Sequence, residues 1–176
     1  MKKKSTNSQS KKLNKFTPLK FIIIYILFMC LFLFLIGLDS VKRIIDINGI
    51  YTKMIVYLTV LALKPFHVVQ SANGSIINLK GISLDVKFGC NGLEAFLIYT
   101  VAILSFPAKK IKKIIGILLG FVIIQLLNII RIALLGLSGI YLKSYFQYFH
   151  IYIAQGIMIA FVLLLFFIWL QYATKK

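Results

Sequence analysis

The sequence predicts an all-α polytopic membrane protein: a bundle of about four transmembrane helices, with an amphipathic helix in the outer leaflet and a small extracytoplasmic β-hairpin or loop. Hydrophobic residues make up 60% of the 176-residue chain, and lysine-rich blocks separate its apolar runs. This composition excludes a soluble globular domain. The net charge of +17 is concentrated in those blocks, where it orients spans and contacts anionic lipid. We therefore expect membrane lipid, and no nucleic acid, as a partner.

The first predicted span follows a basic tail. Residues 1–20 mix lysines with Ser, Asn and Thr, and this polar, self-repelling composition predicts a disordered cytoplasmic tail. Residues 21–38 are almost entirely apolar and give about 27 Å of helix, close to the roughly 30 Å of the hydrocarbon core. A cleavable signal peptide is the alternative. We favour an uncleaved anchor, because the run is longer than the apolar region of a signal peptide and no small-residue cleavage site follows it.

Residues 41–63 predict a helix of a different kind. Only residues 54–63 are continuously apolar, which is enough for about half a bilayer. We therefore expect a helix that lies on, or dips into, the outer leaflet without crossing it. Polar or small residues recur along one face of this helix, at Lys42, Asp46, Gly49 and Lys53.

A short extended segment and three further apolar runs complete the chain. Residues 75–88 alternate polar and apolar side chains on both sides of Lys80-Gly81, which predicts a small β-hairpin or extended loop. The apolar runs that follow cover residues 93–106, about 114–137 and about 149–172.

The loop between the first two of these runs determines the predicted topology. Residues 107–113 hold four lysines after a proline, so the positive-inside rule places this loop in the cytoplasm. With both termini also cytoplasmic, the chain crosses the membrane four times. The predicted organisation is a tail at 1–20, a transmembrane domain at 21–172 and a second cytoplasmic tail at 173–176.

Three chemically competent side chains fall at one membrane level. From the cytoplasmic loop, about 30 Å of helix leads to Arg131 and about 26 Å leads to Cys90. His150 lies about 29 Å from Trp169, which marks the inner end of the last run. A guanidinium, a thiol and an imidazole therefore share one plane at the extracytoplasmic face, as a cysteine protease or transpeptidase would require.

Each of these residues also has a structural alternative. Cys90 precedes an apolar helix whose free N–H groups favour a reactive thiolate, but a free cysteine also packs as a small hydrophobe. Arg131 interrupts an apolar run, which is costly unless the guanidinium faces a polar site or snorkels to the interface. His150 stands among tyrosines and could be an interfacial side chain, and His67 is an alternative imidazole.

Polar neighbours extend the candidate site. Asn128 precedes Arg131 by three residues and shares its helix face, where it could bind substrate or hold the guanidinium. Glu94 lies one turn after Cys90 and could pair with Arg131 or with the imidazole, or serve only as a charge partner. Asn91 could cap the helix or support substrate binding.

The cysteine content argues against other site types. Cys30 and Cys90 are the only cysteines and are separated by a whole predicted span. They provide no disulfide framework and no metal-ligand spacing, so we expect no metal and no other cofactor. Cys30 stands among apolar residues and is expected to be inert packing.

Four segments together resemble the exosortase/archaeosortase family. They are Phe-Gly-Cys-Asn-Gly-Leu-Glu-Ala at 88–95, Phe-Pro-Ala at 106–108, Leu-Leu-Asn-Ile-Ile-Arg-Ile at 126–132 and Phe-His-Ile-Tyr-Ile-Ala-Gln at 149–155. The order of Cys, then Asn-x-x-Arg, then His is specific, and the Cys-Asn-Gly-Leu-Glu-Ala form looks closest to the H-type exosortases. The resemblance covers about residues 88–155, while the amino-terminal half resembles only generic membrane sequence.

This resemblance implies a polytopic cysteine-type peptidase/transpeptidase of the bacterial inner membrane, with its active site on the extracytoplasmic face. Its substrates would be exported proteins with a carboxy-terminal sorting signal, made of a short motif, a transmembrane helix and a basic cluster. It would cleave near the motif and pass the protein to an acceptor nucleophile that the sequence does not identify. The family's proposed catalytic residues correspond to Cys90, Arg131 and His150. Many members carry Ser at the position of Asn91, a departure shared with the H-type forms that bears on motif preference.

Two other classes of function stay open. Several helices with a buried Arg131 could form a small transporter or channel subunit in which the guanidinium binds an anion. The chain could also be a membrane scaffold without chemistry. Only the enzyme requires the thiol of Cys90, so the effect of substituting this residue separates the hypotheses.

Overall fold

The computed structural model describes residues 18–38, 47–86, 90–146 and 154–175. Residues 1–17 of the tail predicted at 1–20, the segment at 41–46 and His150 lie outside these residues, while residues 18–20 of that tail belong to the first described helix. The helices are α2 (Pro18–Gly37), α4 (Ile47–Leu63), α5 (Leu93–Ser105), α6 (Lys110–Tyr141) and α8 (Ala154–Thr174), with the short 3-10 turns η1 (Lys64–Phe66) and η2 (Lys143–Tyr145). The strands are β1 (Val69–Asn73), β2 (Ile76–Leu79) and β3 (Ile82–Asp85).

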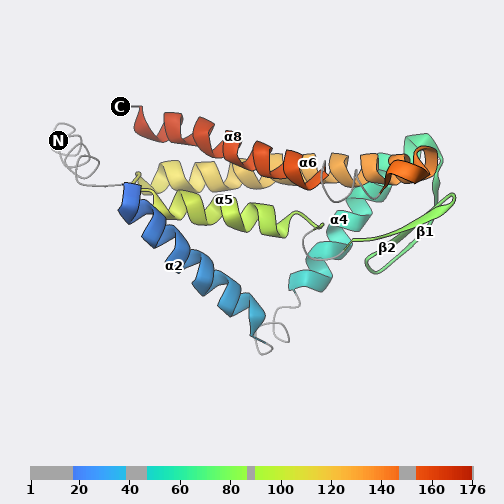
Figure 1. Ribbon diagram of the computed structural model, residues 1–176, viewed down its shortest axis with the longest axis horizontal. Helices are drawn as coiled ribbons and strands as arrows, with labels where there is room; N and C mark the ends of the chain where they lie inside the picture. The colour runs from blue at the N-terminus through green and yellow to red at the C-terminus, as the bar shows by residue number, and fades with distance from the viewer. Residues whose placement is uncertain (1–17, 39–46, 87–89, 147–153, 176) are drawn as a thin grey trace.

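Helix α6 is the axis against which the other elements pack. Its 32 residues give about 48 Å of helix, well beyond the roughly 30 Å of a hydrocarbon core. Helices α5 and α8 lie along its first half, and α4 and the sheet lie along its second half (Figure 1). Two apolar cores result. The bundle core includes Tyr99, Ile103, Ile124, Met158 and Trp169, and the core under the sheet includes Ile55, Leu63, Ile77, Leu79 and Ile132.

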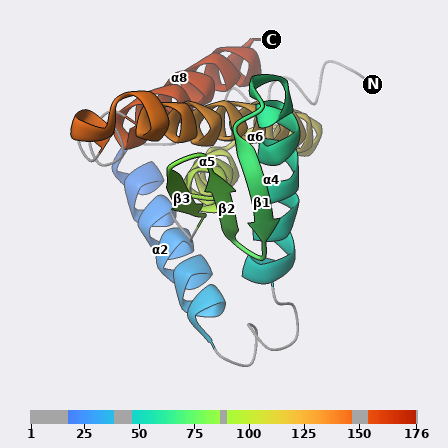
Figure 2. The same cartoon turned by 90° about the vertical axis from the view of Figure 1, so that its right-hand side faces the viewer.

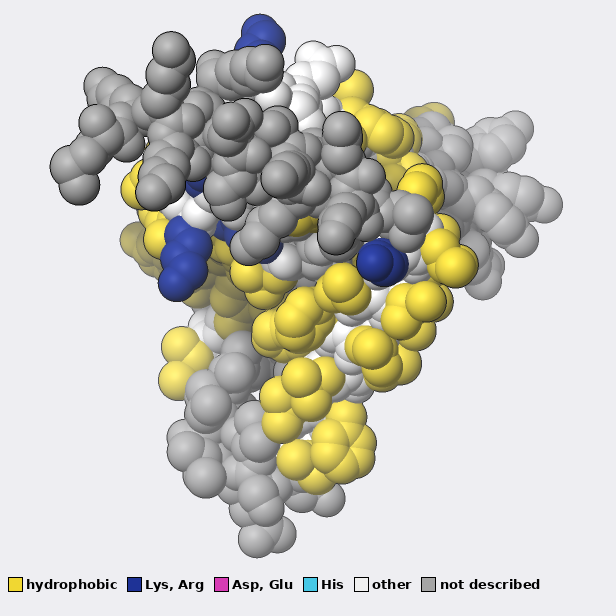
Figure 3. Space-filling view, turned by 90° about the vertical axis from the view of Figure 1, so that its left-hand side faces the viewer, with side chains coloured by type: hydrophobic (Ala, Val, Ile, Leu, Met, Phe, Trp, Pro, Cys, Tyr) yellow, Lys and Arg dark blue, Asp and Glu magenta, His cyan; other side chains and the backbone are white. Residues whose placement is uncertain are grey.

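Lysines close the end of the bundle where α5 and α8 finish and α6 begins, here called the lysine-rich end (residues 107–113 and 173–175). Lys112 Nζ donates to the carbonyl oxygens of Tyr172 and Ala173 at 3.0 and 3.2 Å, and Lys113 Nζ donates to that of Leu104 at 2.7 Å. These lysines satisfy carbonyls that a helix leaves unpaired at its C-terminus. Figure 3 looks at this end and shows Lys or Arg side chains beside a hydrophobic surface.

The structure confirms a multi-pass membrane protein. Within the described residues, three stretches are long and apolar enough to cross a bilayer: Pro18–Leu35, Lys110–Tyr141 and Gln155–Thr174. α5 is also apolar, but its 13 residues give only about 20 Å, so a count of four crossings stays a prediction. The faces turned away from the bundle are apolar, as expected for contact with lipid, and include Leu118, Leu119, Leu126, Leu163, Leu164 and Phe167. The sequence analysis expected Cys30 to pack among apolar side chains. The structure instead shows this cysteine exposed on α2.

Two glycines of α6 allow its neighbours to approach closely. A Cβ at Gly120 would lie 2.0 Å from Cε1 of Tyr99, and one at Gly116 would lie 2.2 Å from Nε1 of Trp169. The two aromatic side chains use this space to donate to the α6 backbone. Tyr99 Oη donates to the carbonyl of Gly116 at 3.2 Å, and Trp169 Nε1 donates to that of Lys112 at 3.0 Å.

Helix α4 packs beside the second half of α6 (Figure 1). Ile55 and Leu63 of α4 are fully buried, in one cluster with Ile132 of α6. α4 is not among the three stretches long and apolar enough to cross, in keeping with a helix that does not span the bilayer.

The predicted hairpin forms part of a three-stranded antiparallel sheet with the order β1-β2-β3. Strands β2 and β3 are joined at Lys80-Gly81, as predicted, and Gly81 has a φ of +93° that favours glycine. Strand β1 was not predicted. Its sequence, Val-Gln-Ser-Ala-Asn, lacks the apolar alternation of a half-buried strand, and four of its five residues are exposed. β1 lies beside α4, and β3 is the strand farther from that helix (Figure 2).

Replacing Gly120 with Ala is expected to destabilise the bundle by about 1–3 kcal/mol, because the added methyl group must displace the Tyr99 ring or separate α5 from α6. The readout is the midpoint of thermal unfolding of the detergent-solubilised protein. Gly156→Ala is the matched control, since an added Cβ on this glycine of α8 has no heavy atom within 4 Å. Equal midpoints for the two variants would contradict the packing described.

Candidate active site

Cys90 lies between the sheet and α5, close to the middle of α6. It is half-buried, and its backbone carbonyl accepts a long hydrogen bond of 3.4 Å from Nη2 of Arg131, a residue 41 positions away in the chain. The sequence analysis placed these two residues at one membrane level, and the structure brings them into contact.

Gly92 makes this approach possible. Its φ of +78° lies in the left-handed region, and a Cβ at this position would lie 2.9 Å from Cγ and Nδ2 of Asn128 on α6. A side chain here would therefore suffer both backbone strain and a steric clash. Because Gly92 has no side chain, the start of α5 packs directly on α6, one turn before Arg131.

Asn91 is fully buried beside the candidate nucleophile. Its Oδ1 accepts a hydrogen bond of 3.1 Å from the backbone N–H of Leu93, at the start of α5, and its Nδ2 donates to Oγ1 of Thr52 on α4 at 3.1 Å. The amide thus satisfies a free N–H group of α5, as a capping residue does. Thr52 was missed by the sequence analysis, because nothing in a local pattern points to a partner 39 residues away.

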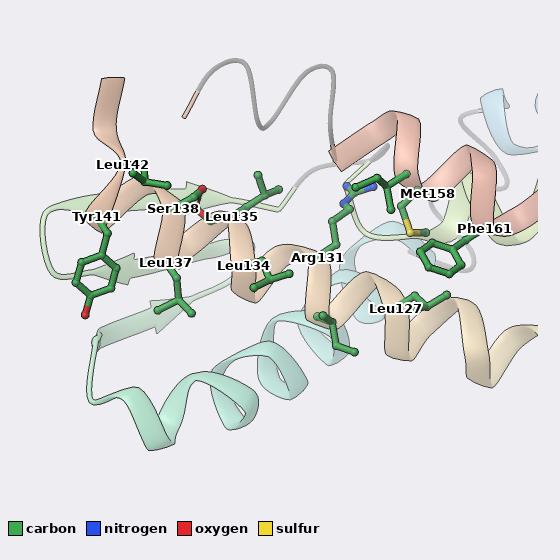
Figure 4. A pocket seen from close by; sticks show the side chains of 12 residues that line it. Leu127, Arg131, Leu134, Leu135, Leu137, Ser138, Tyr141, Leu142, Met158 and Phe161 are labelled. Carbon is green, nitrogen blue, oxygen red and sulfur yellow. Dashed lines mark hydrogen bonds between the residues drawn. The ribbon is translucent and has the colours of Figure 1, made fainter. Parts of the chain in front are cut away.

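Arg131 and Cys90 border two different cavities. Arg131 lines an apolar groove of about 570 Å³ between α6 and α8, together with residues such as Leu134, Ile157, Met158 and Phe161. In Figure 4 the Arg131 side chain extends from α6 toward Met158 of α8. Cys90 lines a smaller cavity of about 150 Å³ against the end of β3, with Asp85, Val86, Ile132 and Phe146. Leu135 borders both spaces.

Two amides are buried in α6 below Arg131. Asn128 is fully buried and Gln125 is 5% exposed. No side-chain nitrogen or oxygen of Asn128 has a hydrogen-bond partner in the part of the chain that the structure describes, whereas the Gln125 side chain faces the Tyr51 hydroxyl of α4. Asn128 therefore does not hold the guanidinium by a hydrogen bond. Gln125 was also missed, although it is a polar residue inside an apolar run and lies one turn before Asn128.

The remaining predicted residues are not assembled around Cys90 by the described structure. Glu94 is half-buried in the first turn of α5, and within the described residues it forms no ion pair with Arg131. His67 is exposed between η1 and β1, on the far side of the sheet from β3, and does not line either cavity. His150 lies outside the described residues, so its role stays a prediction. Among the described residues, no three His, Cys, Asp or Glu side chains form a group that could hold a metal ion.

Replacing Asn128 with Leu is expected to increase the free energy of unfolding by about 1–3 kcal/mol, because a side chain of similar size replaces a buried amide without partners. Thermal unfolding in detergent gives the midpoint for comparison with the unmodified protein. A lower midpoint would contradict the burial of an unpartnered amide at this position.

Comparison with known proteins supports the resemblance seen in the sequence. Residues 13–169 match the family described as Transmembrane exosortase (Exosortase_EpsH), and the H-type form of the Cys90 motif is consistent with this match. No curated protein and no solved structure matches the chain. Since the match covers most of the chain and includes Cys90 and Arg131, the chain belongs to the transmembrane exosortase family.

Proposed function

We propose that this exosortase cleaves the carboxy-terminal sorting signals of exported proteins through a thioester on Cys90 and transfers the cleaved proteins to a new anchor. The observation that carries the proposal is the 3.4 Å contact between Arg131 Nη2 and the Cys90 carbonyl. It places a permanent cation against the backbone of the residue that carries the thiol, in a chain that is otherwise built for lipid. Such a pair is costly in a membrane and is typical of a functional site.

The proposed reaction has two steps. The Cys90 thiolate attacks the scissile carbonyl and forms a C–S bond, and the C–N bond of the peptide then breaks as His150 gives a proton to the leaving amine. An amine, a hydroxyl group or water next attacks the thioester and gives its proton to His150, and Cys90 leaves as thiolate. The planar Arg131 guanidinium has five N–H donors. One contacts the Cys90 carbonyl, and others can stabilise the negative charge that develops on the substrate oxygen.

The groove beside Arg131 supports a substrate that is itself anchored in the membrane. Its walls come from two membrane helices, α6 and α8, and are mainly apolar, with Arg131 among the few polar groups. A transmembrane segment of a sorting signal could lie against these side chains, and its cleavage point would then be near the level of Cys90. The same apolar lining does not suit a path for a hydrated ion, which disfavours the channel hypothesis.

The proposed topology has four crossings, with α5 as a short span. The lysine-rich end lies in the cytoplasm, and the sheet, Cys90 and Arg131 lie at the extracytoplasmic side. The lysines that cap α5 and α8 support this orientation.

Labelling of introduced cysteines tests this orientation. In a background with Cys30 and Cys90 both replaced by Ala, Asn73→Cys at the exposed end of β1 is expected to react with a membrane-impermeant maleimide in intact cells. Lys109→Cys, before α6, is expected to react only after permeabilisation. The opposite labelling pattern would reverse the proposed topology.

Substitution of Cys90 and Arg131 tests the proposed roles. Co-expression with a protein that carries a candidate sorting signal is expected to show no cleavage with Cys90→Ala. Arg131→Ala is expected to lower the rate by at least about 100-fold, as loss of an oxyanion donor does. Both variants should still accumulate in the membrane. Cys30→Ala, an exposed position on α2, is the control and should cleave normally. Normal cleavage by Cys90→Ala would favour the transporter or scaffold hypotheses.

A further inference from the structure

We infer that Thr52 of α4 is a positioning residue for Cys90, acting through the buried side chain of Asn91. This inference rests on the proposed role of Cys90 as nucleophile. It assigns a part in the active site to α4, a helix from the half of the chain that carries none of the family's motifs. The observation behind it is the buried hydrogen bond from Asn91 Nδ2 to Thr52 Oγ1, 3.1 Å long.

The hydrogen-bond pattern determines how the Asn91 amide is oriented. The backbone N–H of Leu93 can only donate, so the side-chain oxygen of Asn91 must face it, at 3.1 Å. The amide nitrogen then points to α4, where the Thr52 hydroxyl oxygen accepts its hydrogen bond. Asn91 is fully buried and Thr52 is 7% exposed, so water is not readily available to replace either partner. The residue next to Cys90 is thus held from both sides.

Helix α4 packs against α6, which holds Thr52 in place for its hydrogen bond with Asn91. Ile55, less than one turn after Thr52, is fully buried in the cluster that contains Ile132 of α6. Cys90 is therefore located by three contacts around the same short turn. They are the Arg131 bond to the Cys90 carbonyl, the packing of Gly92 on Asn128, and the Asn91 bond to Thr52.

Thr59 provides a matched control on the same helix. It is also fully buried, but its hydroxyl has no hydrogen-bond partner in the part of the chain that the structure describes. Thr→Val removes the hydroxyl at either position and keeps the side-chain shape. Only Thr52→Val leaves the Asn91 amide without a buried acceptor, which is costly enough to favour other positions of the Cys90 turn.

The test compares Thr52→Val, Thr52→Ser and Thr59→Val in the full-length protein in membranes. With saturating substrate, Thr52→Val is expected to process a sorting-signal protein roughly tenfold more slowly, with little change in the substrate level that gives half the maximal rate. Thr52→Ser keeps the hydroxyl and should restore most of the rate. Thr59→Val should match the unmodified protein. A rate for Thr52→Val within about twofold of that for Thr59→Val would overturn the inference.

A second readout does not depend on substrate or on catalysis. In a Cys30→Ala background, the rate at which a small neutral maleimide alkylates the half-buried Cys90 should rise at least roughly threefold in Thr52→Val, because the turn is less firmly held. It should not rise in Thr59→Val. Equal rates in these two variants would overturn the inference. Faster alkylation, combined with normal processing by Cys90→Ala, would instead keep the positioning role and reject Cys90 as nucleophile.

A double-mutant cycle separates the bond from general packing. Asn91→Ser keeps a side chain that can cap α5 but is too short to hold the Thr52 contact as well. If the Asn91–Thr52 bond is what positions Cys90, the double variant Thr52→Val/Asn91→Ser should process substrate about as slowly as the slower single variant. If the double variant slowed processing by the product of the two single-variant factors, the two residues would act independently, which would contradict a role through one shared hydrogen bond.

Discussion

The contact between the start of α5 and the middle of α6 is the constraint on which the candidate site depends. Gly92 carries no side chain, so the backbone can rest on Asn128, and Arg131 can then reach the Cys90 carbonyl. Without this approach, the thiol and the guanidinium would lie at the same membrane level but apart. The rest of the fold serves to hold the two partners of this contact. α8 and the glycines of α6 fix the bundle, and α4 and the sheet fix the second half of α6.

The interior around this contact is costly to maintain. Buried side chains usually find hydrogen-bond partners, yet Asn128 finds none in the described part of the chain. An amide without a partner costs about 1–3 kcal/mol of stability. Asn128 lies one turn before Arg131, where the proposed site would need a polar lining for substrate or for water. The glycines of α6 at 116 and 120 lie in its first half and allow close packing of Trp169 and Tyr99.

Most helices of the bundle could be predicted from the sequence, but few of the hydrogen bonds within the candidate site could be. Lipid requires long apolar helices, so α2, α6 and α8 could be found from composition, and the rise of a helix placed Cys90 and Arg131 at one level. α6 is longer than the predicted apolar run of about 114–137, since it begins at Lys110 and ends at Tyr141. Strand β1 could not be predicted, because its sequence does not alternate apolar and polar residues. The bond between Asn91 and Thr52 joins residues 39 positions apart, and no periodic pattern records such a tertiary contact.

The most direct test of the central claim, that the Cys90 thiol carries the substrate, is the mass of the Cys90-containing peptide during turnover. The exosortase would be isolated after co-expression with a sorting-signal protein, and the peptide that contains Cys90 would be examined by mass spectrometry before and after hydroxylamine treatment. The account predicts an adduct on Cys90 that carries the part of the substrate on the amino-terminal side of the cleavage point, joined through its carbonyl and released by hydroxylamine as expected for a thioester. Processed substrate that accumulates while Cys90 carries no adduct, and the same processing by Cys90→Ser, would contradict the account.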